Sequence, residues 1–259
     1  MKKWTSKGIL LAAALLFFGL HGENAFAAGR AGLGDVSGGP GEVQTEEGRL
    51  EEASPVAADG TILPQNLEAA ETADQLIVVT GTGGYDADIF YYKKNGNDWE
   101  LIWQEEGHVG RNGITENKKE GDGATPAGIF SFNLAFGLLE NPGSVLPYHQ
   151  IASGDHWVDD PASRYYNCLV NTGEVSADWN SSENLIKASP YYDYALNTDY
   201  NAERIPGAGS AIFLHCFKTV EDQPTSGCVS LPRERVKELV GAVTADSRMV
   251  IARDKSSLK

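Results

Sequence analysis

The sequence predicts a mainly β fold, a mixed sheet resembling a sandwich or a barrel with one or two short helices. Short runs of β-branched and aromatic residues recur from residue 75 onward. Asn95-Gly96 lies between two of these runs and predicts a β-hairpin, because a type I′ turn needs positive φ at both central residues. Only residues 232–243 carry apolar residues at helical spacing.

The first 27 residues are predicted to be a signal peptide. Three lysines among the first seven residues precede an uncharged apolar run over 8–20, and residues 25–27 fit the small-x-small pattern of a cleavage site. The run is shorter than the roughly 20 residues that a bilayer-spanning helix needs. We therefore expect cleavage after Ala27 rather than an uncleaved anchor, no permanent membrane span, and a location outside the cell or in the cell envelope, in the wall or periplasm.

Residues 28–74 are rich in Gly, Ala and Glu and contain no aromatic residue. Such a segment buries too little apolar surface to offset the entropy lost on ordering. It is interpreted as a disordered acidic linker over 28–74, ahead of a single folded domain over 75–259. Ile62-Leu63-Pro64 could instead be a short piece that docks on that domain.

Charge and cysteine content exclude several classes of protein. The formal net charge of −15 argues against nucleic acid as a partner, because neutralising phosphates needs clustered Lys and Arg. Three cysteines are too few for a disulfide scaffold, and Cys168 and Cys216 are expected to be small buried residues. There is no His-x-x-x-His or Cys-x-x-Cys pair, so neither a metal nor an organic cofactor is expected.

The elements follow in order along the domain. Strands are predicted at 75–80, 88–93 and 99–104 as an antiparallel meander, then at 128–132, 211–214, 227–231 and 248–252, with the helix at 232–243. A glycine-rich loop leads into the strand at 128. The stretch 148–195 interleaves aromatic and amide residues, which suits either a groove for a peptide or sugar or ordinary packing over a β core.

His215 ends an apolar strand, and Cys228 follows thirteen positions later, directly after Gly227. A cysteine thiolate is a strong nucleophile, and an imidazole nearby can lower its pKa and transfer protons. Glycine permits a close backbone approach, and the amides around it could form an oxyanion hole. The pattern indicates a catalytic pair, although burial or surface placement of each residue would also explain it.

Three motifs resemble one family. His215 followed by Thr225-Ser226-Gly227-Cys228-Val229 resembles the His…Ser/Thr-x-Gly-Cys motif of L,D-transpeptidases with the YkuD-like catalytic domain. Residues 118–128 are similar to a Gly-Asp-Gly-x-Thr-Pro-x-Gly signature of one exported branch, and 157–167 to its Trp-x-Asp-Asp-Pro…Tyr-Asn segment. The motifs follow the family's order and cover about residues 75–253.

The resemblance implies a transpeptidase acting on peptidoglycan stem peptides. Cys228 would be the nucleophile and His215 its base, with the imidazole oriented by the carbonyl of Cys216. The N–H groups of Gly227 and Cys228 would hold the oxyanion. Cys228 would form a thioester with a stem tetrapeptide and release D-Ala. An acceptor amine would then give a cross-link, whereas water would make the enzyme an L,D-carboxypeptidase.

Substrate contacts are expected at residues of the same motifs, namely Thr225, Ser226, Trp157, Asp159, Asp160, Tyr166 and Asn167. Ser226 and Ser230 depart from the family, because many members have His at the first position and Asn or Arg at the second. A non-catalytic cell-wall-binding module and a secreted cysteine peptidase or amidase are the alternative functions.

Overall fold

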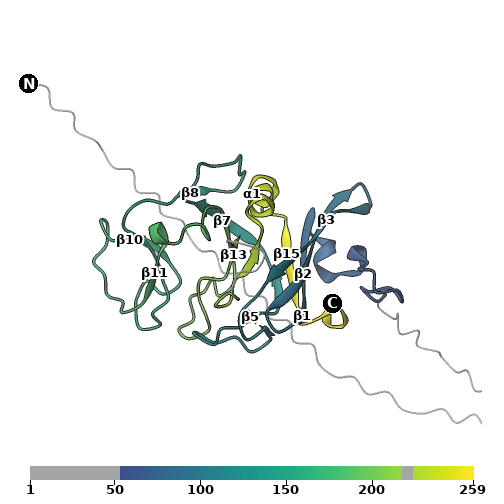
Figure 1. The fold of residues 1–259 in the computed structure, drawn as a ribbon, viewed down its shortest axis with the longest axis horizontal. Coiled ribbons are helices and arrows are strands. Elements are labelled where there is room, and N and C mark those ends of the chain that lie inside the picture. Colours follow the sequence, from purple (N-terminus) through teal and green to yellow (C-terminus); the bar gives the residue numbers. More distant parts are fainter. Residues whose placement is uncertain (1–52, 218–223) are drawn as a thin grey trace, which may run out of the picture. The chain divides into compact units, whose positions relative to one another are not determined.

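A ten-stranded mixed sheet organises the computed structural model, which describes residues 53–217 and 224–259 (Figure 1). The strand order is β6-β15-β1-β2-β3-β14-β13-β12-β7-β8. Its strands are β1 (Gln75–Gly83), β2 (Asp86–Asn95), β3 (Asp98–His108), β6 (Gly128–Phe130), β7 (Phe132–Gly137), β8 (Tyr148–Gln150), β12 (Ala195–Thr198), β13 (Phe213–Cys216), β14 (Val229–Leu231) and β15 (Arg248–Ala252). The predicted mainly β class is confirmed.

Two small sheets and a few helical segments complete the described chain. The three-stranded sheet has the order β10-β9-β11 and comprises β9 (Asp155–Val158), β10 (Leu169–Asn171) and β11 (Ser182–Asn184). The pair β4 (Ile114–Thr115) and β5 (Thr125–Pro126) lies in the glycine-rich region. The helical segments are α1 (Arg233–Ala242) and the 3₁₀ turns η1 (Pro64–Asn66), η2 (Glu68–Glu71), η3 (Leu185–Lys187) and η4 (Lys255–Ser257).

The predicted meander is confirmed, with a different turn from the one expected. β2 pairs antiparallel with both β1 and β3, and Asn95 pairs with Asp98, so Gly96 and Asn97 form the two-residue loop. Of these two residues only Gly96 has positive φ, at 63°. A glycine at the first loop position fits a type II′ turn, which needs positive φ there alone.

Both faces of β1 are buried, which explains its uninterrupted apolar run. Ile77 and Val79 belong to the main core cluster, whereas Leu76 and Val78 belong to a second cluster on the other face. Successive side chains of a strand point to opposite faces of the sheet. A strand covered on both sides therefore needs apolar residues at every position rather than at alternate ones.

The second cluster corrects the predicted linker. Ile62, Leu67 and Ala69 are buried in this cluster together with residues of β1 and β2. Residues 53–74 therefore include ordered, packed chain, and the alternative of a docking piece at Ile62-Leu63-Pro64 describes them better than a disordered linker does. Leucine and alanine at 67–70 supply the apolar surface that the composition argument underestimated. The predicted signal peptide and residues 28–52 lie outside the described residues.

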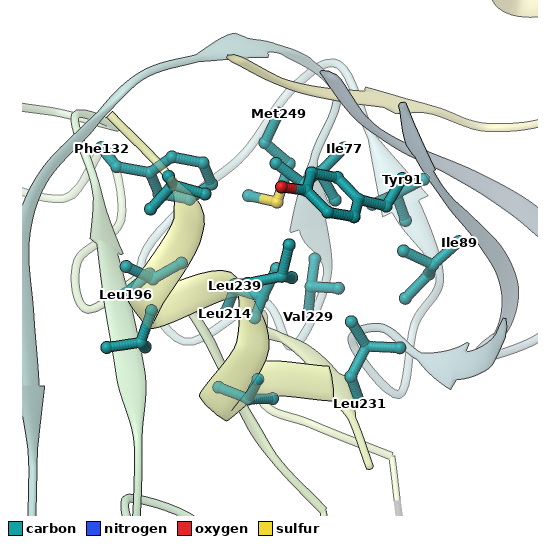
Figure 2. Packing of buried hydrophobic residues seen from close by; sticks show 14 of the residues in the cluster. Ile77, Ile89, Tyr91, Phe132, Leu196, Leu214, Val229, Leu231, Leu239 and Met249 are labelled. Carbon is teal, nitrogen blue, oxygen red and sulfur yellow. The ribbon is translucent and has the colours of Figure 1, made fainter. Parts of the chain in front are cut away.

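The helix α1 supplies one wall of the main core. Its buried residues Val236, Leu239 and Val240 have the i, i+3, i+4 spacing of one helix face and join the main cluster. Figure 2 shows Leu239 among other residues of this cluster. Phe130 of β6, at one end of the strand order, and Phe132 of β7, next to the other end, join the same cluster. The sheet therefore curves around a shared core, as the expectation of a sandwich or barrel required. No helix among the described residues is long and apolar enough to span a membrane.

Candidate active site

Cys228 and His215 line the same cavity, which has a volume of about 490 Å³. Glu183, Tyr192 and Ser230 also line it. The two residues predicted to form a catalytic pair therefore face a common space large enough for part of a peptide.

Neighbouring parallel strands position the pair. β13 pairs with β14 so that His215 lies opposite Ser230, and Cys228 directly precedes β14. The Cys228 thiol donates to the carbonyl of Ala211 at 3.1 Å, and the N–H of Phe213 points at its sulfur at 3.4 Å. Cys228 is buried, with 6% of its surface exposed. The sulfur is thus held by backbone groups at the start of a core strand.

A backbone carbonyl fixes the His215 ring. The Nδ1 atom lies 2.8 Å from the carbonyl oxygen of Cys216. Because a carbonyl oxygen only accepts, Nδ1 carries the hydrogen in the neutral ring, and Nε2 is then the basic nitrogen. The Cys216 side chain lies on the opposite face of β13, in the main core cluster.

The turn before Cys228 is braced by Thr225. Its hydroxyl donates to the carbonyl of Cys228 at 2.6 Å and accepts from the N–H of Gly227 at 3.1 Å. Gly227 has a φ of 148°, and a Cβ there would come within 3.0 Å of the carbonyl oxygen of Ala124. Glycine is therefore required by both conformation and space. Because the Gly227 N–H already has a partner, the Cys228 N–H is the better candidate for the oxyanion donor.

The loop with the sequence Gly-Asp-Gly-Ala-Thr-Pro, residues 121–126, also contacts this turn. The Thr125 hydroxyl donates to the Cys228 carbonyl at 3.3 Å and accepts from the N–H of Gly110 at 2.8 Å. Lys118 forms an ion pair with Asp122 and has a side chain that is 5% exposed. The motif therefore holds the nucleophile's backbone in place, and its residues do not line the cavity.

Burial raises the pKa of the Cys228 thiol well above its usual range, and the negative charge of Glu183 raises it further. The positive charge of Lys118 opposes this effect. This differs from the expectation that the imidazole lowers the pKa, because loss of water around the sulfur dominates. The resting residue is a thiol, so a base must take its proton during the reaction.

Sequence reasoning missed Glu183 and Tyr192. Glu183 follows Ser182 on β11, and Tyr192 donates a hydrogen bond to its carboxylate inside the cavity. Burial raises the pKa of Glu183 to about 7, and the charge of Asp159 adds to the rise. The three-stranded sheet brings this carboxylate to a cysteine 45 positions away in the chain. No sequence pattern around residue 183 indicates that Glu183 and Cys228 line the same cavity.

Of the predicted substrate-binding residues, Thr225 and Ser226 line the cavity, whereas the five from 157–167 do not. Trp157 is buried against Phe136 and Phe213, and Asp160 accepts from the N–H groups of Ala162 and Asn180. These contacts favour the packing interpretation of the aromatic stretch.

Asn167 and Tyr166 support the site indirectly. Asn167 accepts from the indole of Trp157 at 2.9 Å and from the N–H of Ala211 at 3.0 Å. The Ala211 carbonyl in turn accepts from Cys228. Tyr166 is 2% exposed, and its hydroxyl accepts from the N–H of Gly209 at 3.0 Å. The motif therefore holds the irregular segment that leads into β13.

All three cysteines are free. Cys216 is buried as expected, but Cys168 is only partly buried, beside the carbonyl of Tyr166. Within 53–217 and 224–259, no group of three His, Cys, Asp or Glu residues is arranged to hold a metal ion.

A mainly β domain with a buried cysteine and a carbonyl-oriented histidine on one cavity defines a candidate cysteine-nucleophile site. The model of the YkuD family, the L,D-transpeptidase catalytic domain, matches residues 76–251. The chain belongs to this family. The match spans every strand from β2 to β14 and contains both His215 and Cys228.

The chain is also similar to solved structures. The structure of Bdellovibrio bacteriovorus Bd1075 is 15% identical, covers 73% of this chain and 51% of its own, and has a TM-score of 0.40. An Enterococcus faecium L,D-transpeptidase mutant is 14% identical, with coverage of 70% and 51% and a TM-score of 0.34. An L,D-transpeptidase from Stackebrandtia nassauensis is 14% identical, with coverage of 73% and 60% and a TM-score of 0.32. The matched part spans about half the length of the first two proteins, and no curated protein matches the chain.

Proposed function

We propose that this chain is an exported, cysteine-dependent peptidoglycan L,D-transpeptidase. The observation that carries the proposal is that Cys228 and His215 line one cavity, with His215 on β13 and Cys228 directly before the paired strand β14. Membership of the family supports the reaction type. The fixed tautomer of His215 supports its role as base, because Nε2 is then free of the ring hydrogen.

In the first half-reaction, the Cys228 sulfur attacks the carbonyl of the third residue of a stem tetrapeptide as His215 takes the thiol proton. The oxyanion that forms accepts a hydrogen bond from the Cys228 N–H. The bond to D-Ala then breaks, and the imidazolium gives its proton to the leaving amine. The product is a thioester on Cys228.

In the second half-reaction, an amine of a neighbouring stem attacks the thioester and forms a cross-link. Water in its place would release a tripeptide and make the protein an L,D-carboxypeptidase. Both outcomes use the same nucleophile and base, so the identity of the acyl acceptor decides between them.

Intact-mass spectrometry with a carbapenem tests the nucleophile. We expect one adduct on the wild type, no adduct on Cys228→Ala, and an undiminished adduct on Cys168→Ala, which removes a partly buried free cysteine elsewhere. Release of D-Ala from purified muropeptides should follow the same pattern. A wild type that binds muropeptides without forming an adduct or releasing D-Ala would instead be a wall-binding module.

Export is proposed from the lysine-rich start, the apolar run and the small-x-small site at residues 25–27. It places the protein in the cell envelope or outside the cell. N-terminal sequencing of the protein recovered from the envelope fraction tests this, with Ala28 expected as the first residue. Recovery of the intact chain with Met1 from the cytosol would overturn it.

A further inference from the structure

Two residues that line the cavity carry buried hydrogen-bond acceptors that have no protein donor in the part of the chain that the structure describes. The hydroxyl oxygen of Ser230 and the amide oxygen of Asn184 are both buried without a hydrogen-bond partner among the residues that the structure describes. Both residues line the cavity with Cys228, and Ser230 is 1% exposed. Buried polar atoms in native proteins almost always have a partner. Their position indicates that a ligand supplies the missing donor.

Glu183 adds a negative charge to these acceptors. Its carboxylate accepts from Tyr192, and within 53–217 and 224–259 no Lys, Arg or His forms an ion pair with it. Asp159 places a second carboxylate close enough to raise the pKa of Glu183. One oxygen of Asp159 is buried without a hydrogen-bond partner. A partly buried carboxylate without a countercharge is costly and is stabilised by a cationic ligand.

The ligand chemistry follows from this set of groups. An ammonium group brings one positive charge and three N–H donors and has no acceptor. It therefore matches a carboxylate beside an amide oxygen and a hydroxyl, whereas a second carboxylate or a phosphate would be repelled. Because Cys228, which would carry the acyl group, lines the same cavity, an ammonium bound here would share the cavity with the reacting carbonyl.

We propose that Glu183 selects the acyl acceptor: its carboxylate binds the ammonium group of an amine substrate and takes one proton from it, so that an amine rather than water resolves the acyl-enzyme. The inference rests on the proposed function, because it needs a thioester on Cys228. It assigns the amine-binding part of the cavity to Glu183, with Asn184 and Ser230 as further acceptors.

The step balances in atoms and charge. Glu183 takes one proton from the ammonium, and the neutral amine nitrogen then attacks the thioester carbonyl. The carbon–nitrogen bond forms and the carbon–sulfur bond breaks. The second proton passes from the nitrogen through His215 to the sulfur, which restores the thiol. The products are an amide, neutral Glu183 and the Cys228 thiol, and Glu183 then releases its proton to solvent.

The test measures how the acyl-enzyme divides between two products. The wild type, Glu183→Gln and Glu183→Asp receive a tetrapeptide stem as donor and a second stem as acceptor, with its side-chain amine free or acetylated. Mass spectrometry gives the ratio of cross-linked dimer to hydrolysed tripeptide, and carbapenem adduct formation gives the acylation rate separately. Glu174→Gln is the matched control, because Glu174 is an exposed glutamate outside the cavity.

We expect Glu183→Gln to lower the dimer-to-tripeptide ratio by about tenfold or more, because a charge-assisted hydrogen bond is lost. Acylation should be unchanged or faster, since the charge of Glu183 raises the pKa of the thiol. Glu183→Asp should keep part of the preference, Glu174→Gln all of it, and the acetylated acceptor should give no dimer. A general loss of structure would instead slow both steps together.

Three results would overturn the inference or its basis. An unchanged ratio in Glu183→Gln, with normal acylation, shows that another group selects the acceptor. A wild type that forms only tripeptide shows that water resolves the thioester and that Glu183 does not favour amines. A wild type without an adduct on Cys228 contradicts the proposed function itself. If Glu183→Gln does not fold, Glu183→Asp tests the same assignment through a smaller fall in the ratio, because it shortens the side chain and keeps the charge, and an unchanged ratio there would contradict the inference.

Discussion

The hydroxyl of Thr225 joins both ends of the turn that presents Cys228. It donates to the Cys228 carbonyl at 2.6 Å and accepts from the Gly227 N–H at 3.1 Å. The main chain of Thr225 also pairs with the loop at 109–111, since its N–H donates to Val109 and its carbonyl accepts from Arg111. The backbone at Cys228 is therefore held by hydrogen bonds from Thr225, which is itself hydrogen-bonded to the loop at 109–111.

Replacing Thr225 by valine keeps the shape and removes both side-chain hydrogen bonds. We expect a loss of about 1–2 kcal/mol in the free energy of unfolding and about tenfold slower acylation of Cys228, measured by urea denaturation and carbapenem adduct formation. Thr172→Val is the control, because Thr172 is exposed, its hydroxyl donates one 3.3 Å hydrogen bond to the carbonyl of Gly154, and neither residue lines the cavity. Equal effects of the two substitutions would contradict this role.

Gly227→Ala tests the positive φ at the turn. Gly227 has a φ of 148°, which side chains rarely adopt, and a Cβ added there would come within 3.0 Å of the Ala124 carbonyl oxygen. We expect a loss of about 1–3 kcal/mol in unfolding free energy together with slow acylation. Gly143→Ala separates the two causes, because Gly143 has a φ of 108° and no atom within 4 Å of a Cβ. It should cost less and leave acylation unchanged.

His215→Ala should slow acylation at neutral pH by about 10²–10⁴-fold, because the buried thiol loses its base. Burial raises the pKa of Cys228, so little thiolate forms without help near pH 7. The residual rate should therefore increase steadily as the pH is raised toward 10, whereas the wild type should gain much less. A pH profile of adduct formation checks this, and a flat residual rate would show that thiol ionisation is not limiting.

Glu183→Gln should stabilise the protein above neutral pH. The folded pKa is raised to about 7 from a reference of 4.5, so the folded state binds the proton more tightly. The stabilisation that the protonated Glu183 carboxyl gives the folded state is fully present below pH 4.5 and is lost as the pH rises through 7. The variant should therefore gain at most about 3 kcal/mol at pH 8 and show no difference near pH 4. Chemical denaturation at both values measures the change, and equal gains at both would exclude titration as its cause.

Leu67→Ala tests whether the segment before β1 is part of the domain. Leu67 is 2% exposed and lies in the second core cluster, so the substitution should cost about 2–4 kcal/mol in unfolding free energy. A leucine in a disordered linker would cost nothing. Leu101→Ala is the matched control, since Leu101 is 48% exposed, and its expected cost is below about 1 kcal/mol.

Local patterns sufficed for the elements that depend on near neighbours. The hairpin of β2 and β3, the run of β1 and the periodic helix α1 follow from the glycine at the turn and from side-chain spacing, so the predicted ranges overlap the observed ones although the turn type differs. The linker prediction failed over residues 53–74 because the partner of Leu67 is the outer face of β1 and β2. The composition of residues 53–74 does not show that another part of the chain offers an apolar surface for them to pack on.

By itself, the sequence determined the family, the mainly β class and the candidate pair of His215 and Cys228, because a motif and a strand pattern are local properties of the chain. Only the tertiary structure decided which charges face that pair. It buried Trp157, placed the partly buried Asn167 against its indole outside the cavity, and brought Glu183 of β11 into the cavity. Burial then set the thiol and carboxylate pKa values, because the loss of water depends on the whole fold around an atom and not on its neighbours in the chain.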